Sequence, residues 1–135
     1  MISSLRQRLS RDEQGFTLIE LLVVIIILGI LLAIAVPSYL GFKQKAEQTA
    51  ASSDVREAIP SAEAYYSDHN DSYTGLSFAG LQAYDNGVSN NLSKVEATGG
   101  GVGYCISAHV GSSWSHVNGP GGQVTADGNA GDQCP

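Results

Sequence analysis

The feature that most constrains this chain is an apolar run from Leu21 to Val36, sixteen residues without a polar side chain. Extended back to Phe16, the segment has 21 residues, of which only Thr17 and Glu20 are polar. As an α-helix it would be about 31 Å long, close to the hydrocarbon thickness of a bilayer. Lipid offers no partners to backbone polar groups, so a helix is favoured over a strand despite the β-branched residues. The sequence therefore predicts one transmembrane helix.

Basic residues before the apolar run predict its orientation in the membrane. Arg6, Arg8 and Arg11 precede the run, and no Lys or Arg follows it before Lys43. Under the positive-inside rule this asymmetry keeps the N-terminus in the cytoplasm. The rest of the chain is then expected on the outer side of the cytoplasmic membrane.

A cleaved secretory signal peptide is an alternative explanation of the same segment. Ala33-Ile34-Ala35 is a weak match to the small-residue cleavage site of such peptides. However, the apolar run is longer than a signal-peptide core, and the acidic Glu20 stands near its start.

Composition and motifs argue against nucleic-acid binding and catalysis. With 7 Lys+Arg against 13 Asp+Glu the net charge is −6, which does not suit a phosphate-binding protein. The three histidines lack metal-ligand spacing, and the run from Asp68 to Ser72 lacks the Gly and Glu of a calcium loop. The glycine run 99–103 precedes a predicted strand rather than a phosphate-binding helix. We expect no enzyme activity, no cofactor, no metal and no nucleic-acid partner.

Glu20 is the one acidic residue of the apolar segment, and two interpretations of it remain open. A carboxylate at such a depth costs about 2–3 kcal/mol on insertion scales. Its side chain either reaches the membrane interface or awaits a positive partner when the helix leaves the lipid.

The segment from Gln14 to Val24, QGFTLIELLVV, resembles the class III signal and N-terminal segment of type IV pilins and their relatives. This resemblance implies a leader of residues 1–15, which a prepilin peptidase removes by cutting between Gly15 and Phe16. The same enzyme would methylate the new amino group of Phe16.

The resemblance also implies roles for several positions along the helix. Glu20 matches the acidic residue that the family uses in processing or assembly, and Thr17 stands where such helices usually have a threonine, which implies a part in assembly. Gly29 and Pro37 match positions where such helices weaken or kink, and proline independently disrupts helical hydrogen bonding.

Cleavage would place a new positive charge close to Glu20. The α-amino group of Phe16 would lie four residues before the Glu20 carboxylate. In a filament packed by these helices, Glu20 of one subunit would neutralise the terminal amine of a neighbour, because two buried charges are tolerated best as a pair.

After Pro37 the pattern becomes amphipathic and predicts one continuing helix over 38–70, ending near Asp68 and bent at Pro60. Its apolar side is expected to pack on a small domain. The residues expected on that side are Tyr39, Phe42, Ala46, Ala50, Val55, Ile59, Ala62 and Tyr66.

Residues 71–135 hold 13 of the 16 glycines and predict a small, turn-rich sheet. Strands are expected over 102–110, 112–118 and 123–126, with 76–95 a loop that contains a short helix at most. Alternation places four residues on the face toward the helix: Tyr104, Ile106, Ala108 and Val110. The predicted fold is α+β and pilin-like: a transmembrane or filament-core helix (16–37), an amphipathic helix (38–70) and an antiparallel sheet (71–135).

Cys105 and Cys134 are the only cysteines. Because the domain is expected outside the cytoplasm, a disulfide is the natural interpretation, with two free thiols as the alternative. A bond across this loop would stabilise the fold by about 3–4 kcal/mol. It also resembles the C-terminal disulfide loop of many pilins.

The resemblance implies a structural subunit of an extracellular type IV pilus, acting in adhesion, motility or related surface roles. The subunit would be a single-pass membrane precursor that meets the prepilin peptidase and an inner-membrane assembly platform before it polymerises. Alternatives are a pseudopilin of a type II secretion system, a minor pilin for adhesion or DNA uptake, and a monomeric membrane-anchored binding module. The last would make the Gly15–Phe16 junction and Glu20 coincidental.

Overall fold

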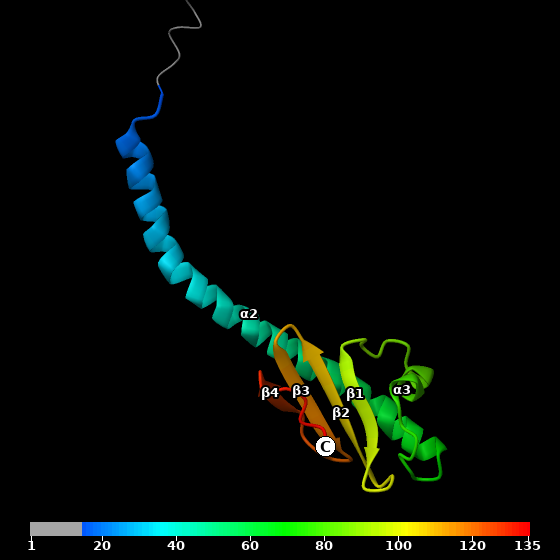
Figure 1. Cartoon of the computed structure of the whole chain (residues 1–135). Coiled ribbons are helices and arrows are strands. Elements are labelled where there is room, and N and C mark those ends of the chain that lie inside the picture. Colours follow the sequence, from blue (N-terminus) through cyan, green and yellow to red (C-terminus); the bar gives the residue numbers. More distant parts are fainter. Residues whose placement is uncertain (1–14) are drawn as a thin grey trace, which may run out of the picture. The chain divides into compact units, whose positions relative to one another are not determined.

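The computed structural model describes residues 15–135, so residues 1–14 of the predicted leader lie outside the described residues. The chain divides into two compact units between Tyr39 and Leu40. One long helix, α2 (Leu18–Asp68), runs through both. A short helix α3 (Phe78–Tyr84) and four strands complete the fold (Figure 1).

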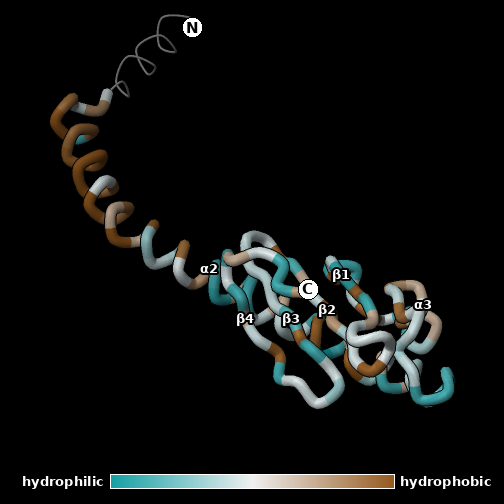
Figure 2. Tube along the Cα trace, turned by 60° about the horizontal axis from the view of Figure 1, so that its bottom comes forward, coloured by the Kyte–Doolittle hydropathy of each residue, from teal (hydrophilic) through white to brown (hydrophobic). Residues whose placement is uncertain are grey.

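The first unit is the apolar part of α2, and its side chains are exposed throughout. Figure 2 shows this stretch as almost continuously hydrophobic. The helix is long enough and apolar enough to cross a membrane, and none of its most apolar stretch is buried within the described chain. An apolar surface of this kind needs lipid or another protein to cover it.

The helix is uninterrupted at Gly29, Pro37 and Pro60. These residues therefore lie within α2 rather than at its ends. The helix ends at Asp68, where the sequence predicts its end. The kinks expected at Gly29 and Pro37 stay predictions.

The buried face of α2 begins later than the amphipathic pattern predicts. Tyr39, Phe42, Ala46 and Ala50 were expected on the packed side, but all four are exposed. The buried residues of the helix are Ala51, Val55, Ala58, Ser61, Ala62 and Tyr65. The expectation is wrong for the first four because the earlier turns of the helix meet the sheet only through polar contacts, such as that of Gln44 with Ser113, and periodicity alone does not reveal where burial begins.

The sheet is antiparallel, with its strands in the order β1-β2-β3-β4, so each strand pairs with its sequence neighbours. The strands are β1 (Leu92–Thr98), β2 (Gly103–Val110), β3 (Ser113–Gly119) and β4 (Thr125–Gly128). The α+β fold with a small antiparallel sheet is thereby confirmed.

Two details of the strand prediction are wrong. The strand β1 was not predicted, and its first residues lie in the region expected to be loop, whereas α3 is the short helix allowed there. The strand β4 begins two residues later than predicted. Register shifts between Leu92 and Lys94, and between Trp114 and Ser115, disturb the alternation that marks a strand in a sequence.

The core lies between the second half of α2 and one face of the sheet. Tyr104, Ile106 and Ala108 of β2 are buried with Val55 and other α2 residues, as the alternation predicts. Val110, expected on the same face, is only partly buried because it lies at the end of the strand. On α3, the hydroxyl of Ser77 caps the first turn by accepting from the Gly80 amide at 3.3 Å. This cap positions a helix that contributes the fully buried Leu81.

The structure joins Cys105 and Cys134 in a disulfide, the pair expected from the sequence. Cys105 lies in β2, directly opposite Glu96 of β1 and Asn118 of β3. The bond therefore ties the last residues of the chain to the centre of the sheet. Its partner strands leave Cys105 fully buried.

Candidate assembly site at the start of the helix

The first turn of α2 holds the acidic residue that the sequence singles out. The Glu20 carboxylate accepts hydrogen bonds from the backbone N–H of Thr17 at 2.8 Å and from its hydroxyl at 2.7 Å. The Thr17 hydroxyl in turn accepts from the Glu20 N–H at 3.3 Å. This reciprocal arrangement is a capping box, which satisfies otherwise unpaired donors at a helix N-terminus.

The capping box leaves half of the carboxylate available. Both Thr17 donors bind the Oε2 atom of Glu20, and no residue within 15–135 donates to Oε1. A cation from outside the chain can therefore approach Oε1 without breaking the cap.

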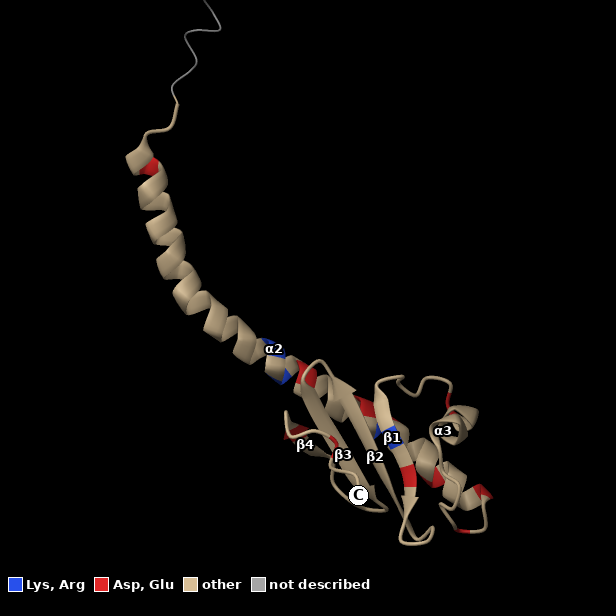
Figure 3. Ribbon diagram, viewed as in Figure 1, with Lys and Arg blue, Asp and Glu red and all other residues tan. Residues whose placement is uncertain are grey.

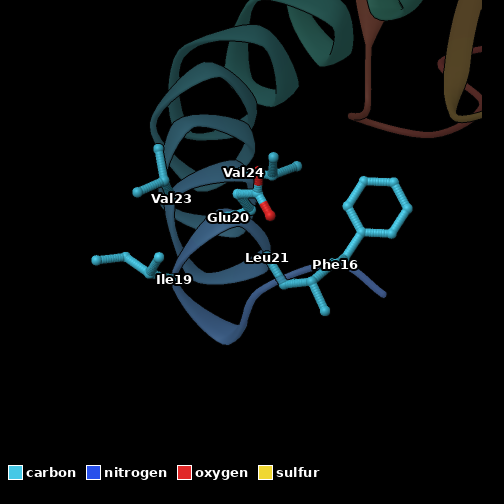
Figure 4. A pocket seen from close by; sticks show the side chains of 6 residues that line it. All are labelled: Phe16, Ile19, Glu20, Leu21, Val23 and Val24. Atoms are coloured by element: carbon cyan, nitrogen blue, oxygen red, sulfur yellow. The ribbon is translucent and has the colours of Figure 1, made fainter. Parts of the chain in front are cut away.

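A shallow hollow of about 470 Å³ surrounds this carboxylate. Figure 4 shows the six side chains that line it, among which Glu20 alone carries oxygen. They are Phe16, Ile19, Glu20, Leu21, Val23 and Val24. An ion pair formed here would be poorly screened only once lipid or a neighbouring molecule excludes water, because the other side chains that line the hollow are apolar.

Thr17 and Glu20 stand out separately in the sequence, and their joint role in capping the helix was not predicted. The signal was present, since Thr17-Leu18-Ile19-Glu20 has the S/T-x-x-E spacing immediately before an apolar run. Phe16 lies next to the cap with its side chain exposed. Gly29 and Pro37 lie further along the same helix and take no part in this site.

A second carboxylate, Glu63 of α2, binds two tyrosines in the core of the globular unit. It accepts from the Tyr73 hydroxyl at 2.9 Å and from the Tyr104 hydroxyl at 3.1 Å. Burial, reinforced by the negative charge of Glu63, raises the pKa of both tyrosines well above the usual range. No local pattern indicates this Glu63–tyrosine cluster, because its members lie up to 41 residues apart.

A third carboxylate fixes the β2–β3 turn to the helix. Glu47 accepts from the backbone N–H of Ser112 at 3.0 Å and from its hydroxyl at 3.2 Å, and it pairs with Lys43 at 3.5 Å. The hydrogen bond from the Ser112 amide is the main reason that the pKa of Glu47 is lowered.

The histidines are dispersed over the globular unit. The His69 ring stacks on Tyr65, the His109 ring stacks on Trp114, and the His116 Nδ1 lies 2.7 Å from an Asp127 oxygen. Within residues 15–135, no group of three or more His, Cys, Asp or Glu side chains is arranged to hold a metal ion.

Comparison with known proteins gives a family match at the N-terminus. Residues 10–36 match the model of the prokaryotic N-terminal methylation motif. This range includes the Gly15–Phe16 junction and the start of α2.

Curated relatives fall into two groups. The type IV wide pilus major component PilA4 of Thermus thermophilus is 35% identical over 106 residues, covering 75% of this chain and 77% of that protein. The type IV major pilin protein PilA of Myxococcus xanthus is 29% identical over 104 residues, covering 77% of this chain and 41% of that protein. The type II secretion system core protein G of Aeromonas hydrophila is 45% identical over 60 residues.

Coverage differs between these relatives. The match to the Aeromonas protein covers 44% of this chain and spans only 42% of that relative's length. No solved structure matches the chain significantly. Because the Thermus match extends over three quarters of both proteins and the methylation motif matches as well, the chain belongs to the family of type IV pilins and type II secretion pseudopilins.

Proposed function

We propose that the chain is the structural subunit of an extracellular type IV pilus. It is made as a single-pass precursor with its N-terminus in the cytoplasm. The prepilin peptidase cuts it between Gly15 and Phe16 and methylates Phe16, and an inner-membrane platform then adds it to the filament. The globular unit forms the filament surface, where it serves adhesion, motility or related roles.

The observation that carries this proposal is the extent of similarity to the Thermus pilus component. That alignment spans 106 residues and so must include much of the globular unit, whereas the alignment to the Aeromonas secretion protein spans only 60. Similarity that extends into the globular unit favours the pilus over the secretion system.

The exposed first unit of α2 supports polymerisation. Its apolar side chains are covered by lipid before assembly and by neighbouring copies afterwards. The free Oε1 atom of Glu20 would accept the Phe16 amine of a neighbour, which fixes the axial position of one copy against the next. The capped first turn holds this carboxylate in place for that contact.

Intact mass spectrometry of protein sheared from the surface of producing cells tests the proposal. The expected species begins at methylated Phe16, contains one disulfide and is abundant in the sheared fraction. A chain that keeps its first fifteen residues while the peptidase is active would contradict it.

A pseudopilin of a type II secretion system is the second candidate. Identities of 41–51% to type II secretion system core protein G from several bacteria favour it, over 45 to 73 residues. The same processed mass confined to the membrane fraction would support this alternative.

A further inference from the structure

A small polar groove lies in the globular unit where α2 passes β4. It has a volume of about 180 Å³ and is hereafter called the basic groove. Its lining comes from one side of α2 and from one β4 residue. The lining residues are Lys45, Gln48, Thr49, Ser52, Arg56 and Ala126.

The basic groove carries two positive charges that the described chain does not neutralise. Lys45 and Arg56 form no ion pair within residues 15–135, whereas Lys43 pairs with Glu47 and Lys94 pairs with Glu96. No acidic residue lines the groove. From Phe16 onward the chain has only 4 Lys+Arg against 11 Asp+Glu, so two free cations in one groove are a marked local excess.

Little else in the groove competes for an anion. The Thr49 hydroxyl already donates to the Lys45 carbonyl at 2.9 Å, and the Ser52 hydroxyl bonds Ser115 at 2.9 Å. The two cations and the Gln48 amide therefore remain as donors. A carboxylate is the matching acceptor for an Arg guanidinium and a Lys ammonium.

The opposite charge gathers at the far end of α2. Asp68 and Asp71, together called the acidic tip, are exposed, and no Lys or Arg occurs between Arg56 and Lys94. Figure 3 likewise shows Asp and Glu without Lys or Arg at that end of the helix. Asp68 accepts only from the Tyr84 hydroxyl, at 3.0 Å, and the Asp71 side chain forms no hydrogen bond within the described chain.

We propose that the basic groove of one copy receives the acidic tip of another copy. The inference rests on the proposed filament and adds a contact between globular units to the packing of the apolar helices. Within one chain, Ser52 and Asp68 lie about 24 Å apart along the helix, so the two features do not satisfy each other. A second copy displaced along the axis by about that length brings its tip to the groove.

The geometry of this contact suits a filament. The surfaces that meet are different, so after two copies bind, one copy still presents a free tip and the other a free groove. Such a heterologous contact does not close on itself unless a rotation makes a ring, and otherwise it extends into a helical polymer.

Charge reversal of both features in the full chain tests the proposal, with sheared filament yield from producing cells as the readout. We expect Lys45→Glu/Arg56→Glu and Asp68→Lys/Asp71→Lys each to lower the yield about tenfold, because like charges then face each other. The four-site variant that combines both reversals restores attraction and is expected to regain most of the yield. Glu57→Lys, which reverses an exposed acid outside both features, is the control and should assemble normally.

Milder variants keep the test decisive if reversal impairs folding. Asp68→Asn keeps an acceptor for Tyr84, and Asp71→Asn suits the left-handed backbone at φ 57°. The tip variant Asp68→Asn/Asp71→Asn and the groove variant Lys45→Gln/Arg56→Gln should each lower the sheared filament yield and make that yield less sensitive to salt.

The outcomes separate this contact from the proposed function itself. If the wild-type chain forms no surface filament, the proposed function fails. If wild type assembles and both reversals assemble equally well, only the groove–tip contact is overturned. If the groove reversal lowers the filament yield and the tip reversal does not, the groove–tip contact is also overturned, because the groove then binds another acidic partner.

Discussion

At the scale of single residues, the most consequential feature of the globular unit is a carboxylate that has no cation beside it. Glu63 is held by the hydroxyls of Tyr73 and Tyr104, whose rings also pack edge to face at 4.8 Å. A partly buried charge tolerates this environment because charge-assisted hydrogen bonds replace those of water. Removing it would leave two buried hydroxyls without an acceptor.

Replacing Glu63 by alanine should therefore destabilise the globular unit by about 2–3 kcal/mol, the usual effect of stranding buried polar groups. Glu63→Gln keeps an acceptor and should cost less than half as much. Guanidinium unfolding at neutral pH gives both free energies. A Glu63→Ala variant as stable as wild type would show that the two hydroxyls have other partners.

Alkaline pH should weaken the same Glu63–tyrosine cluster. The folded pKa of Tyr73 and Tyr104 lies above the unfolded value of about 10, so their protonated forms favour the folded state. This contribution is complete below pH 10 and declines as the pH rises above it. Thermal midpoints between pH 8 and 11 should fall more steeply for wild type than for a Tyr73→Phe/Tyr104→Phe variant.

At the scale of elements, the sequence predicts the long helix and its end well, because apolar composition and turn residues are local signals. It also predicts the core face of β2, where Tyr104, Ile106 and Ala108 alternate without interruption. It misses β1, in which the register shift near Leu92 and the half-buried side chains blur the alternation. The buried extent of α2 is likewise missed, since it depends on where a distant sheet ends.

The cap formed by Thr17 and Glu20 was not predicted for a different reason. Both residues stand out in the sequence, but their common role requires the S/T-x-x-E spacing to be considered with the helix start. The Glu63–tyrosine cluster has no local signature, and the basic groove shows only the helical spacing of its α2 residues between Lys45 and Arg56. They depend on tertiary contacts such as that between Ser52 and Ser115, which are 63 residues apart.

The disulfide is the covalent link between the sheet and the chain end. Cys105→Ala/Cys134→Ala should lower the free energy of unfolding by about 3–4 kcal/mol, because the loop would be unconstrained in the unfolded state. Chemical denaturation of the oxidised protein and of the variant measures the difference. Equal stabilities would mean that the residues after β4 contribute nothing through this link.

At the scale of the whole molecule, the apolar and globular units have different requirements. The apolar unit needs lipid or a neighbouring protein to cover its surface, whereas the globular unit has a core of its own. Glu20 belongs to the first unit, and the proposed function assigns it a contact between chains rather than a part in the stability of the globular unit.

Glu20→Ala should leave peptidase cleavage intact and lower the sheared filament yield about tenfold or more, because the neighbour's amine would lose its counter-ion. Glu20→Asp keeps the charge on a shorter side chain and should retain part of the yield. Cleavage is followed by intact mass and yield by quantifying the sheared fraction. Normal cleavage together with a normal yield of Glu20→Ala filaments would exclude the ion pair.

Burial along α2 also bears on how such chains diversify. The first buried residue of the described chain is Ala51, so the globular core draws nothing from the preceding 35 described residues of α2 and its approach (16–50). Substitutions in that core and substitutions in the apolar segment therefore act on separate sets of contacts. Substitutions on the globular unit can therefore change its surface and its core while the apolar segment keeps all of its own side chains and contacts.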